Sequence, residues 1–374
     1  MLQAFNFGKA IEDLLVNGEP GGYWRYPITE HVLTYNTHFP PEQMLDEIRA
    51  NLRNLIACYP STQNILAEHV GRLVNANPSM LAVGNGTVEL IQFLIKNKRL
   101  RIALAIPSFG IYEDAAKPDR VCYIALRPPE FRVDVDEVLH CVLTNQLDAA
   151  VLISPNNPTS LSVRREELLY LARELARADK LLILDESFVE FARLGKEQSL
   201  QSNLSELSNV IIIKSLGKIY GICGSRVGYA LSSNERLISD IRQEIPLWNL
   251  NAIAEYFIVN LPRFRAEFGE SIEIVKRECD LLHANLAQIP GGNALRPDGN
   301  FIFFHLPDDW PTGSELASRV LREHSILVRH CGGKTMEGGI RYLRISARTE
   351  KENGALVAAL VESARESRSA TFHP

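Results

Sequence analysis

Short apolar runs alternate with helix-like segments through the middle of this chain, and this alternation constrains the fold more than any other feature. The runs are short and rich in β-branched residues, as strands are; they lie at 101–105, 121–126, 149–154, 181–185 and 210–214. Between them, segments such as 165–178 place leucine and alanine at helix spacing, with charges on the opposite side. This order predicts an α/β fold, in which a large three-layer αβα domain has a mostly parallel sheet between two helix layers.

The pattern changes after Trp248, where longer helical segments precede a second set of strand-like runs. Runs at 301–306, 326–329 and 340–346, with helical segments at 314–323 and 351–366, predict a smaller α+β domain. We therefore expect a large domain over residues 36–250 and a small domain formed by residues 1–35 together with 251–374. A chain of 374 residues with 46% hydrophobic content can bury two such cores.

Composition and charge exclude several classes of function. The formal charge of -5 and the lack of a basic run interleaved with aromatic residues argue against a nucleic-acid partner. The six cysteines are scattered and the nine histidines do not cluster with them, so neither a disulfide framework nor a metal site is expected. No apolar segment reaches membrane-spanning length, and residues 1–9 do not have the form of a signal peptide, so we expect a cytoplasmic protein with no membrane partner.

Lys218 is the residue that most clearly suggests a chemistry. It follows the apolar run 210–213 and precedes a glycine-rich segment in which Arg226 lies eight positions later. A buried lysine is costly unless its pKa falls or its amine is captured covalently. Lysines that form a Schiff base with pyridoxal phosphate (PLP) meet this condition, and Arg226 could hold the cofactor phosphate. The simpler alternative is a surface lysine in a loop.

Three separated segments carry a resemblance to a known enzyme family: 154–160 (Ser-Pro-Asn-Asn-Pro-Thr-Ser), 184–188 (Leu-Asp-Glu-Ser-Phe) and 215–229 around Lys218. In order and spacing they are similar to the fold-type-I PLP enzymes of aminotransferase class I/II, in the branch of histidinol-phosphate aminotransferases and threonine-phosphate decarboxylases. Weaker similarity extends from about Tyr35 to Arg344. The resemblance implies the PLP-dependent transferase fold type I, PLP as the cofactor, a small-molecule amino-acid substrate and a homodimer.

The same resemblance assigns roles around the cofactor. Lys218 would carry it as a Schiff base and the Asp185 carboxylate would favour a protonated ring nitrogen, so these two are the expected catalytic residues. Asn157 would donate to the phenolic oxygen of the ring, and Phe109 would stack on its face. The expected phosphate donors are the amides of Gly86, Thr87 and Val88, together with Ser215, Arg226 and a Tyr59 that reaches across from the neighbouring subunit.

Two arginines are expected to bind the substrate. Arg344 resembles the arginine that clamps the substrate α-carboxylate through two parallel hydrogen bonds, with Asn157 beside it. Arg329 is similar to a second substrate arginine, which could meet a phosphate or an acidic tail. A solvated charge at the end of a strand is the alternative for Arg329.

Some residues depart from the usual pattern of the family. Ser160 stands where glycine is usual, Phe188 where many transaminases have tyrosine, and Arg348 where aminotransferases of this branch often have glycine. Phe188 and Arg348 are features of decarboxylase-like members, but the His-Gly-Gly start typical of threonine-phosphate decarboxylases is absent. We therefore expect an aminotransferase of the histidinol-phosphate-aminotransferase type, with a decarboxylase of a phosphorylated amino acid as the alternative.

Two other classes of protein are compatible with parts of this pattern. A nucleotide-binding dehydrogenase shares the alternation of strands and helices, but no Gly-x-Gly-x-x-Gly motif opens a helix after an early strand. A catalytically silent binding protein on the same fold would retain many of the same residues. The intact set of Lys218, Asp185, Asn157 and Arg226 argues against a silent protein.

Overall fold

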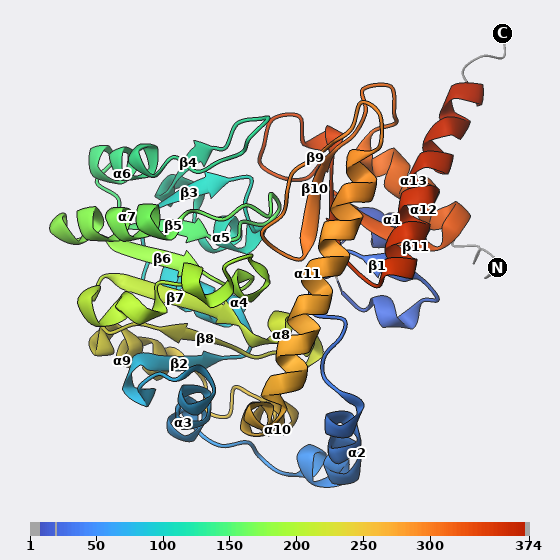
Figure 1. The fold of residues 1–374 in the computed structure, drawn as a ribbon. Coiled ribbons are helices and arrows are strands. Elements are labelled where there is room, and N and C mark those ends of the chain that lie inside the picture. Colours follow the sequence, from blue (N-terminus) through green and yellow to red (C-terminus); the bar gives the residue numbers. More distant parts are fainter. Residues whose placement is uncertain (1–7, 19–20, 371–374) are drawn as a thin grey trace.

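The computed structural model describes residues 8–18 and 21–370 and contains two β-sheets, each packed against its own helices (Figure 1). The strands are β1 (Thr29–His31), β2 (Leu81–Gly84), β3 (Ile102–Ile106), β4 (Val121–Ala125), β5 (Ala149–Ile153), β6 (Leu181–Asp185), β7 (Val210–Ser215), β8 (Gly228–Leu231), β9 (Asn293–Ala294), β10 (Phe301–His305), β11 (Ile326–His330) and β12 (Tyr342–Ser346). Residues 1–7, on which the expectation of no signal peptide largely rests, lie outside the described residues.

The α-helices connect and cover these strands. They are α1 (Lys9–Asn17), α2 (Glu42–Ala57), α3 (Gln63–Val74), α4 (Thr87–Ile91), α5 (Gly110–Ala115), α6 (Val135–Thr144), α7 (Arg165–Arg177), α8 (Leu216–Ile219), α9 (Glu235–Glu244), α10 (Ala252–Asn260), α11 (Arg265–Ala287), α12 (Gly313–His324) and α13 (Glu350–Ala370). A π-helical segment, Gln92–Asn97, continues α4.

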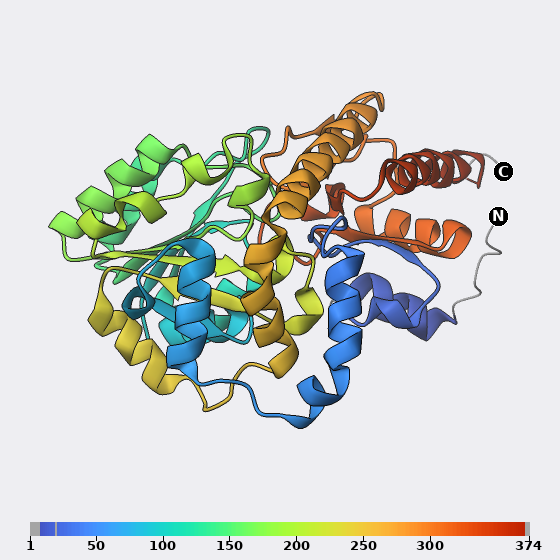
Figure 2. The ribbon, with the colours of Figure 1, turned by 60° about the horizontal axis from the view of Figure 1, so that its bottom comes forward.

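The large sheet has seven strands in the order β2-β8-β7-β6-β5-β3-β4. Neighbouring strands run parallel from β7 to β4, and β8 runs antiparallel to both β7 and β2. Helices α6 and α7 cover one face of this sheet, and α4, α5 and α9 cover the other (Figures 1 and 2). The predicted αβα architecture with a mostly parallel sheet is therefore confirmed.

Both faces of the large sheet are buried, which explains why its strands read as continuous apolar runs. In β6, Leu182 and Leu184 point into the core beneath α6 and α7, and Ile183 points into the core beneath α4, α5 and α9. Successive side chains of a strand alternate between its faces, so an unbroken apolar run is needed to fill both cores. The ends of such strands are then the natural places for polar residues.

The small sheet has the order β1-β11-β12-β10-β9 and is covered by α1, α12, α13 and part of α11. Strand β1 pairs in parallel with β11, so the N-terminal segment joins the C-terminal part of the chain in one sheet. Helix α11 contributes Ile272 and Val275 to the core of the large sheet and Leu282 and Leu286 to that of the small sheet. The long helix thus ties the two sheets together, while the exact domain boundaries at 35/36 and 250/251 stay a prediction.

A cluster of buried charges lies just behind the ends of β6 and β7. The Lys214 Nζ is 2.7 Å from Glu190 Oε1 and 4.0 Å from Glu186 Oε2, and all three side chains are buried. The Glu186 carboxylate also accepts hydrogen bonds from the Ser199 hydroxyl and from the Leu200 N–H. Burial opposes the positive charge on Lys214, but the neighbouring carboxylates outweigh it and raise the pKa of the amine.

This cluster gives a stability prediction. Lys214→Met should lower the free energy of unfolding by about 3–5 kcal/mol, because it leaves buried carboxylates without a counter-charge. The matched control is Lys117→Met at an exposed lysine, which should stay within about 0.5 kcal/mol of the unmodified protein. Urea unfolding followed by circular dichroism measures both, and equal stabilities of the two variants would contradict the prediction.

Candidate active site

The predicted polar residues meet at one edge of the large sheet. Asn157 follows β5, Asp185 is the last residue of β6, and Lys218 lies in the short helix α8 directly after β7. These three strands are parallel neighbours, so their carboxyl ends open onto the same edge.

Asp185 is held as a buried carboxylate, with only 3% of its surface exposed. Its Oδ2 accepts a hydrogen bond from the Tyr112 hydroxyl at 3.0 Å, and its Oδ1 accepts one from the Ser187 N–H at 2.9 Å. Burial and the Asp185 charge raise the pKa of Tyr112 well above its ordinary value, so the hydroxyl stays protonated and donates. The sequence motifs do not identify Tyr112, because its partner Asp185 is 73 positions away in the chain.

The Lys218 amine lies between two aromatic rings. Its Nζ is 5.3 Å from the centroid of the Phe109 ring and 4.8 Å from that of Phe188. Burial lowers the pKa of this amine, and the Asp185 carboxylate opposes part of that effect. A lysine whose pKa is lowered spends more time as the neutral amine, which is the nucleophilic form.

A glycine turn and Arg226 lie together beside α4. Gly86 has φ +74°, and a methyl group on it would lie 2.5 Å from Arg226 Nη2. The Gly86 N–H already donates to Gly84 O at 2.8 Å, whereas Thr87 and Val88 open α4, where the first amides have no partner within the helix. Ser215 closes β7 and donates its N–H to the Ser187 hydroxyl at 3.1 Å. Of the predicted phosphate-binding residues, Thr87, Val88 and Arg226 therefore offer amide and guanidinium donors at adjacent places in the fold, whereas the Gly86 and Ser215 amides are already bonded.

Arg344, on β12 of the small sheet, connects that sheet to the loop after β5. Its Nη1 donates to Asn157 Oδ1 at 3.1 Å, and its Nη2 donates to Val32 O. Burial lowers the pKa of Arg344 to about 10. Arg329 is the direct cross-strand partner of Arg344, so the two predicted substrate arginines are neighbours on one face of the sheet.

Tyr59 is the one predicted site residue that the structure does not connect to this cluster. Its side chain is 77% exposed and stacks on the ring of Trp248, with centroids 4.2 Å apart. Its contribution to a neighbouring subunit stays a prediction.

Ser160, the residue in place of the usual glycine, adopts a glycine-like backbone with φ +62°. Its hydroxyl accepts a hydrogen bond from the Gly299 N–H at 3.0 Å, and its carbonyl accepts one from the Asp298 N–H at 2.7 Å. The serine therefore keeps the turn after Asn157 and attaches it to the segment that leads into β10.

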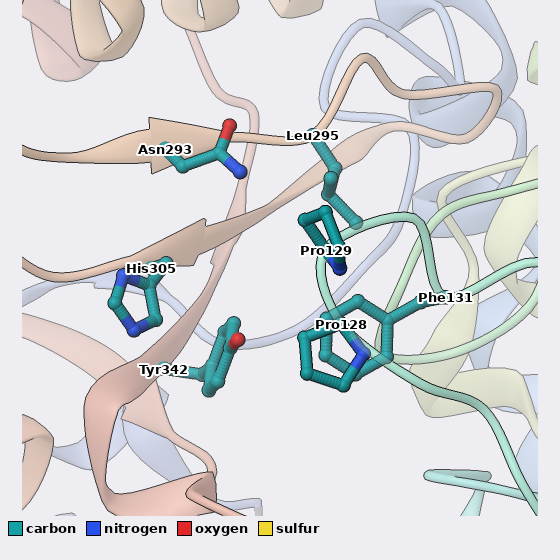
Figure 3. A pocket seen from close by; sticks show the side chains of 7 residues that line it. All are labelled: Pro128, Pro129, Phe131, Asn293, Leu295, His305 and Tyr342. Atoms are coloured by element: carbon teal, nitrogen blue, oxygen red, sulfur yellow. The ribbon is translucent and has the colours of Figure 1, made fainter.

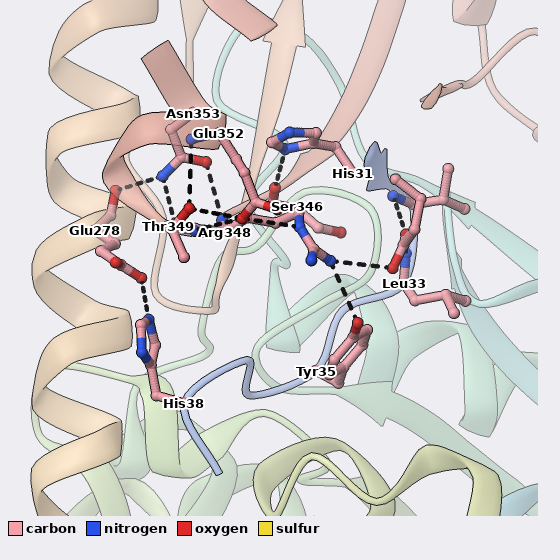
Figure 4. A network of polar contacts seen from close by, with 12 residues as sticks. His31, Leu33, Tyr35, His38, Glu278, Ser346, Arg348, Thr349, Glu352 and Asn353 are labelled. Carbon is pink, nitrogen blue, oxygen red and sulfur yellow. Dashed lines mark hydrogen bonds and ion pairs between the residues drawn. The ribbon is translucent and has the colours of Figure 1, made fainter. Parts of the chain in front are cut away.

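Arg348, which follows β12, is part of a network of polar contacts (Figure 4). Its Nη1 is 3.3 Å from both Glu30 Oε1 and the Tyr35 hydroxyl. Glu30 Oε2 in turn accepts from the Val32 and Leu33 N–H groups at 2.9 and 2.7 Å. The Val32 carbonyl accepts a hydrogen bond from Arg344. The contacts from Arg348 through Glu30 to the Val32 N–H therefore hold in place the residue that binds the Arg344 guanidinium.

A separate cavity of about 280 Å³ opens between the loop after β4 and the small sheet (Figure 3). It is lined by Pro128, Pro129, Phe131, Asn293, Leu295, His305 and Tyr342. Tyr342 precedes Arg344 by two positions on β12, but its ring packs against Phe131 and Phe303 at this place. None of the predicted site residues lines the cavity.

The chain belongs to the aminotransferase class I and II family, whose model matches residues 33–360. It is 38% identical over 346 residues to a CMP-5'-(3-aminopropyl)phosphonate synthase of Streptomyces rubellomurinus, covering 91% of this chain and 54% of that protein. The chain thus spans about half the length of this relative. It is also 31% identical to an L-serine phosphate decarboxylase of Sulfurospirillum multivorans, covering 88% of this chain and 87% of that protein.

Solved structures give the same fold. A decarboxylase from Sulfurospirillum multivorans superimposes with a TM-score of 0.80 at 29% identity, covering 91% of this chain and 97% of the other. More distant relatives include histidinol-phosphate aminotransferases, such as one of Thermoanaerobacter pseudethanolicus that is 26% identical over 93% of this chain and 98% of its own. The predicted family and PLP-dependent fold type are therefore confirmed, and enzymes of this family use PLP.

The residues at the site fit this cofactor. Lys218 offers a half-buried amine between two rings, and Asp185 offers a buried carboxylate that donors hold in place. The cradle at Gly86 has no room for a side chain beside Arg226, as expected where backbone approaches a phosphate. Within the described residues, no group of three histidine, cysteine or acidic side chains is placed to hold a metal ion, and no helix is long and apolar enough to cross a membrane.

The position of Lys218 gives a labelling prediction. Borohydride reduction of the PLP-loaded protein should attach the pyridoxyl group to Lys218 and not to Lys214, because the Lys214 amine is already paired with Glu190. Peptide mass spectrometry identifies the labelled lysine, and Lys218→Ala is the control that should abolish the label. A pyridoxyl group on Lys214 would remove Lys218 from the role assigned to it.

Proposed function

We propose that this protein is a PLP-dependent decarboxylase of an amino acid whose side chain ends in a phosphoryl or phosphonyl group. The observation that carries the proposal is the pair of adjacent arginines, Arg344 and Arg329, facing the end of the large sheet where Lys218 lies. Two guanidinium groups side by side repel each other, so their placement favours a substrate with two anionic groups.

The relatives support a decarboxylase more than the aminotransferase that we expected first from the sequence. One relative is named for a phosphonate that carries a terminal amine, and two others are named for removing carboxylate from serine phosphate. The histidinol-phosphate aminotransferases are more distant, at 23% to 26% identity. An aminotransferase remains the second candidate, because the same residues serve both reactions.

The proposed roles follow from the positions of the side chains. Asn157 and Arg344 bind the α-carboxylate, and the fixed guanidinium holds the substrate through paired hydrogen bonds. Asp185 would hold a proton on the ring nitrogen of the cofactor, since hydrogen bonds from the Tyr112 hydroxyl and the Ser187 N–H fix the position of its carboxylate. When bound, PLP accepts the electron pair that the departing carboxylate leaves on Cα.

Lys218 is the proposed acid that completes the reaction. The bond between Cα and the carboxylate breaks, carbon dioxide leaves, and the Lys218 side chain, as the ammonium that has taken up a proton from the substrate amino group, delivers a proton to Cα and returns to the neutral amine. Phe109 and Phe188 on either side of the amine exclude water from this step. Phenylalanine at position 188 also leaves the phenolic oxygen of the cofactor without the hydroxyl that a tyrosine would supply.

Two broader expectations stay predictions: a cytoplasmic location, and a homodimer in which Tyr59 of the partner subunit approaches the phosphate. The exposed Tyr59 is compatible with such a contact.

The reaction can be tested with a panel of phosphorylated, acidic and neutral amino acids, without added keto acid. We expect repeated turnovers with release of carbon dioxide from O-phospho-L-serine or a phosphonate analogue, while the absorbance of the bound cofactor stays unchanged. A decarboxylase needs no second substrate, because the amino group leaves with the product. Carbon dioxide is measured with a coupled assay, and Lys218→Ala is the inactive control.

The opposite outcome identifies the second candidate. A single turnover that converts the cofactor to pyridoxamine phosphate, without carbon dioxide, would mark an aminotransferase that waits for a keto acid.

A further inference from the structure

Lys334 is a cation at the active site that belongs to none of the motifs. It lies in the loop between β11 and β12, and its Nζ donates to Ser108 O at 2.7 Å. A methyl group on Gly110 would lie 3.9 Å from the same Nζ. The amine therefore reaches from the small-sheet side of the molecule to the residues that flank Phe109, whose ring is 5.3 Å from Lys218 Nζ.

Lys334 joins Arg329 and Arg344 in a group of three cations whose hydrogen-bond partners are neutral. Within the described part of the chain, these partners are Gly18 O for Arg329, Ser108 O for Lys334, and Val32 O with Asn157 Oδ1 for Arg344. Burial, and then the charge of Arg344, lower the pKa of Lys334 to about 8. Cys331 and Glu113 act in the opposite direction, but the Glu113 carboxylate is already bonded to the Thr335 hydroxyl.

Among the described residues, two buried hydroxyl groups near these cations have no partner at hydrogen-bond geometry. The Tyr23 hydroxyl belongs to a side chain that is 5% exposed, and the Ser108 hydroxyl to one that is 1% exposed. Burial raises the pKa of Tyr23, while the backbone of Gly21 and then the charges of Arg329 and Arg344 lower it in part. The Nε of Arg344 is likewise buried and meets no acceptor in the part of the chain that the structure describes. Buried donors without partners are uncommon in folded proteins, and a bound oxyanion would satisfy them.

We propose that Lys334 is a specificity-determining residue that binds the phosphoryl or phosphonyl group on the side chain of the substrate, together with Arg329 and the Tyr23 hydroxyl. This proposal rests on the proposed function, since it assigns a binding site to the phosphoryl or phosphonyl group of the proposed substrate. Arg344 and Asn157 bind the α-carboxylate, and Lys334 reaches Ser108, just before the start of α5.

A lysine suits this task because its ammonium is a flexible point charge with several donors. One donor can remain on Ser108 O while the others turn to a phosphate oxygen. Holding the substrate at both anions would also fix its rotation about the bonds to Cα. Lys334 should therefore affect which bond at Cα is broken, as well as how tightly the substrate binds.

The first test is equilibrium binding of methylphosphonate to the PLP-loaded protein, measured by calorimetry. Lys334→Met should weaken binding about 10- to 100-fold, the factor expected from one charge-assisted hydrogen bond. Lys334→Arg should retain binding within a few-fold, and Lys351→Met, at an exposed lysine of α13, should leave it unchanged. Equal affinities of Lys334→Met and the unmodified protein would overturn the proposal.

A second test needs no substitution and so does not depend on the folding of a variant. Acetic anhydride modifies free lysine amines, and mass spectrometry measures the modification at each position. Methylphosphonate should protect Lys334 in the PLP-loaded protein and leave Lys351 equally reactive. Equal modification of Lys334 with and without methylphosphonate would contradict its role.

The kinetics of Lys334→Met separate this proposal from the function itself. We expect KM for O-phospho-L-serine to rise about tenfold or more, with little change for L-serine, and a larger share of turnovers to end in pyridoxamine phosphate. If the unmodified protein releases no carbon dioxide from any phosphorylated amino acid, yet Lys334 binds methylphosphonate, the proposed reaction fails and the anion site stands. If carbon dioxide is released and KM is unaffected by Lys334→Met, the reaction stands and the proposed role of Lys334 fails.

Discussion

The layout of this site depends on the hydrogen bonds that the buried carboxylate of Asp185 accepts. A buried polar group without hydrogen-bond partners costs several kcal/mol, so the fold must supply donors to this carboxylate. Here the Tyr112 hydroxyl and the Ser187 N–H supply them, one from α5 and the other from the turn after β6. Burial lowers the pKa of Lys218, and the same carboxylate raises it in part. The strand order that places β6 between β5 and β7 is therefore also what brings the amine, the carboxylate and Asn157 to one edge.

The site is completed by residues that come from the small-sheet side of the molecule. The Asn36 N–H donates to Lys218 O at 2.8 Å, and the carbonyl of Val32 holds the Arg344 guanidinium. Gly221, with φ +63°, lets the end of α8 pass against the backbone of Asn36 and Phe39, where a side chain would collide. The segment 32–36 thus contacts both the Arg344 guanidinium and the helix that carries Lys218, and Glu30, which is paired with Arg348, accepts a hydrogen bond from the Val32 N–H of the same segment (Figure 4).

Much of the large sheet could be predicted from the sequence, since buried parallel strands need the unbroken apolar runs that β3 to β7 contain. The short strands β1 and β9 have no apolar run in the sequence, and they are recognised as strands only by their pairing with β11 and β10. The motifs located Asn157, Asp185 and Lys218, but Tyr112 and Lys334 reach the site through contacts that span 73 and 226 positions. No local pattern encodes such contacts. The choice of reaction was also beyond the motifs, because it depends on how the substrate is oriented over residues that both reactions share.

The most direct test of the account follows the hydrogen on Cα. The protein is given O-phospho-L-serine that carries deuterium at Cα, in ordinary water, and the product amine is analysed by mass spectrometry. Breakage of the bond to the carboxylate predicts a product amine that keeps its deuterium and gains one proton from Lys218. Loss of the deuterium to water, with a keto acid as the product, would show that the bond to hydrogen breaks and would contradict the account.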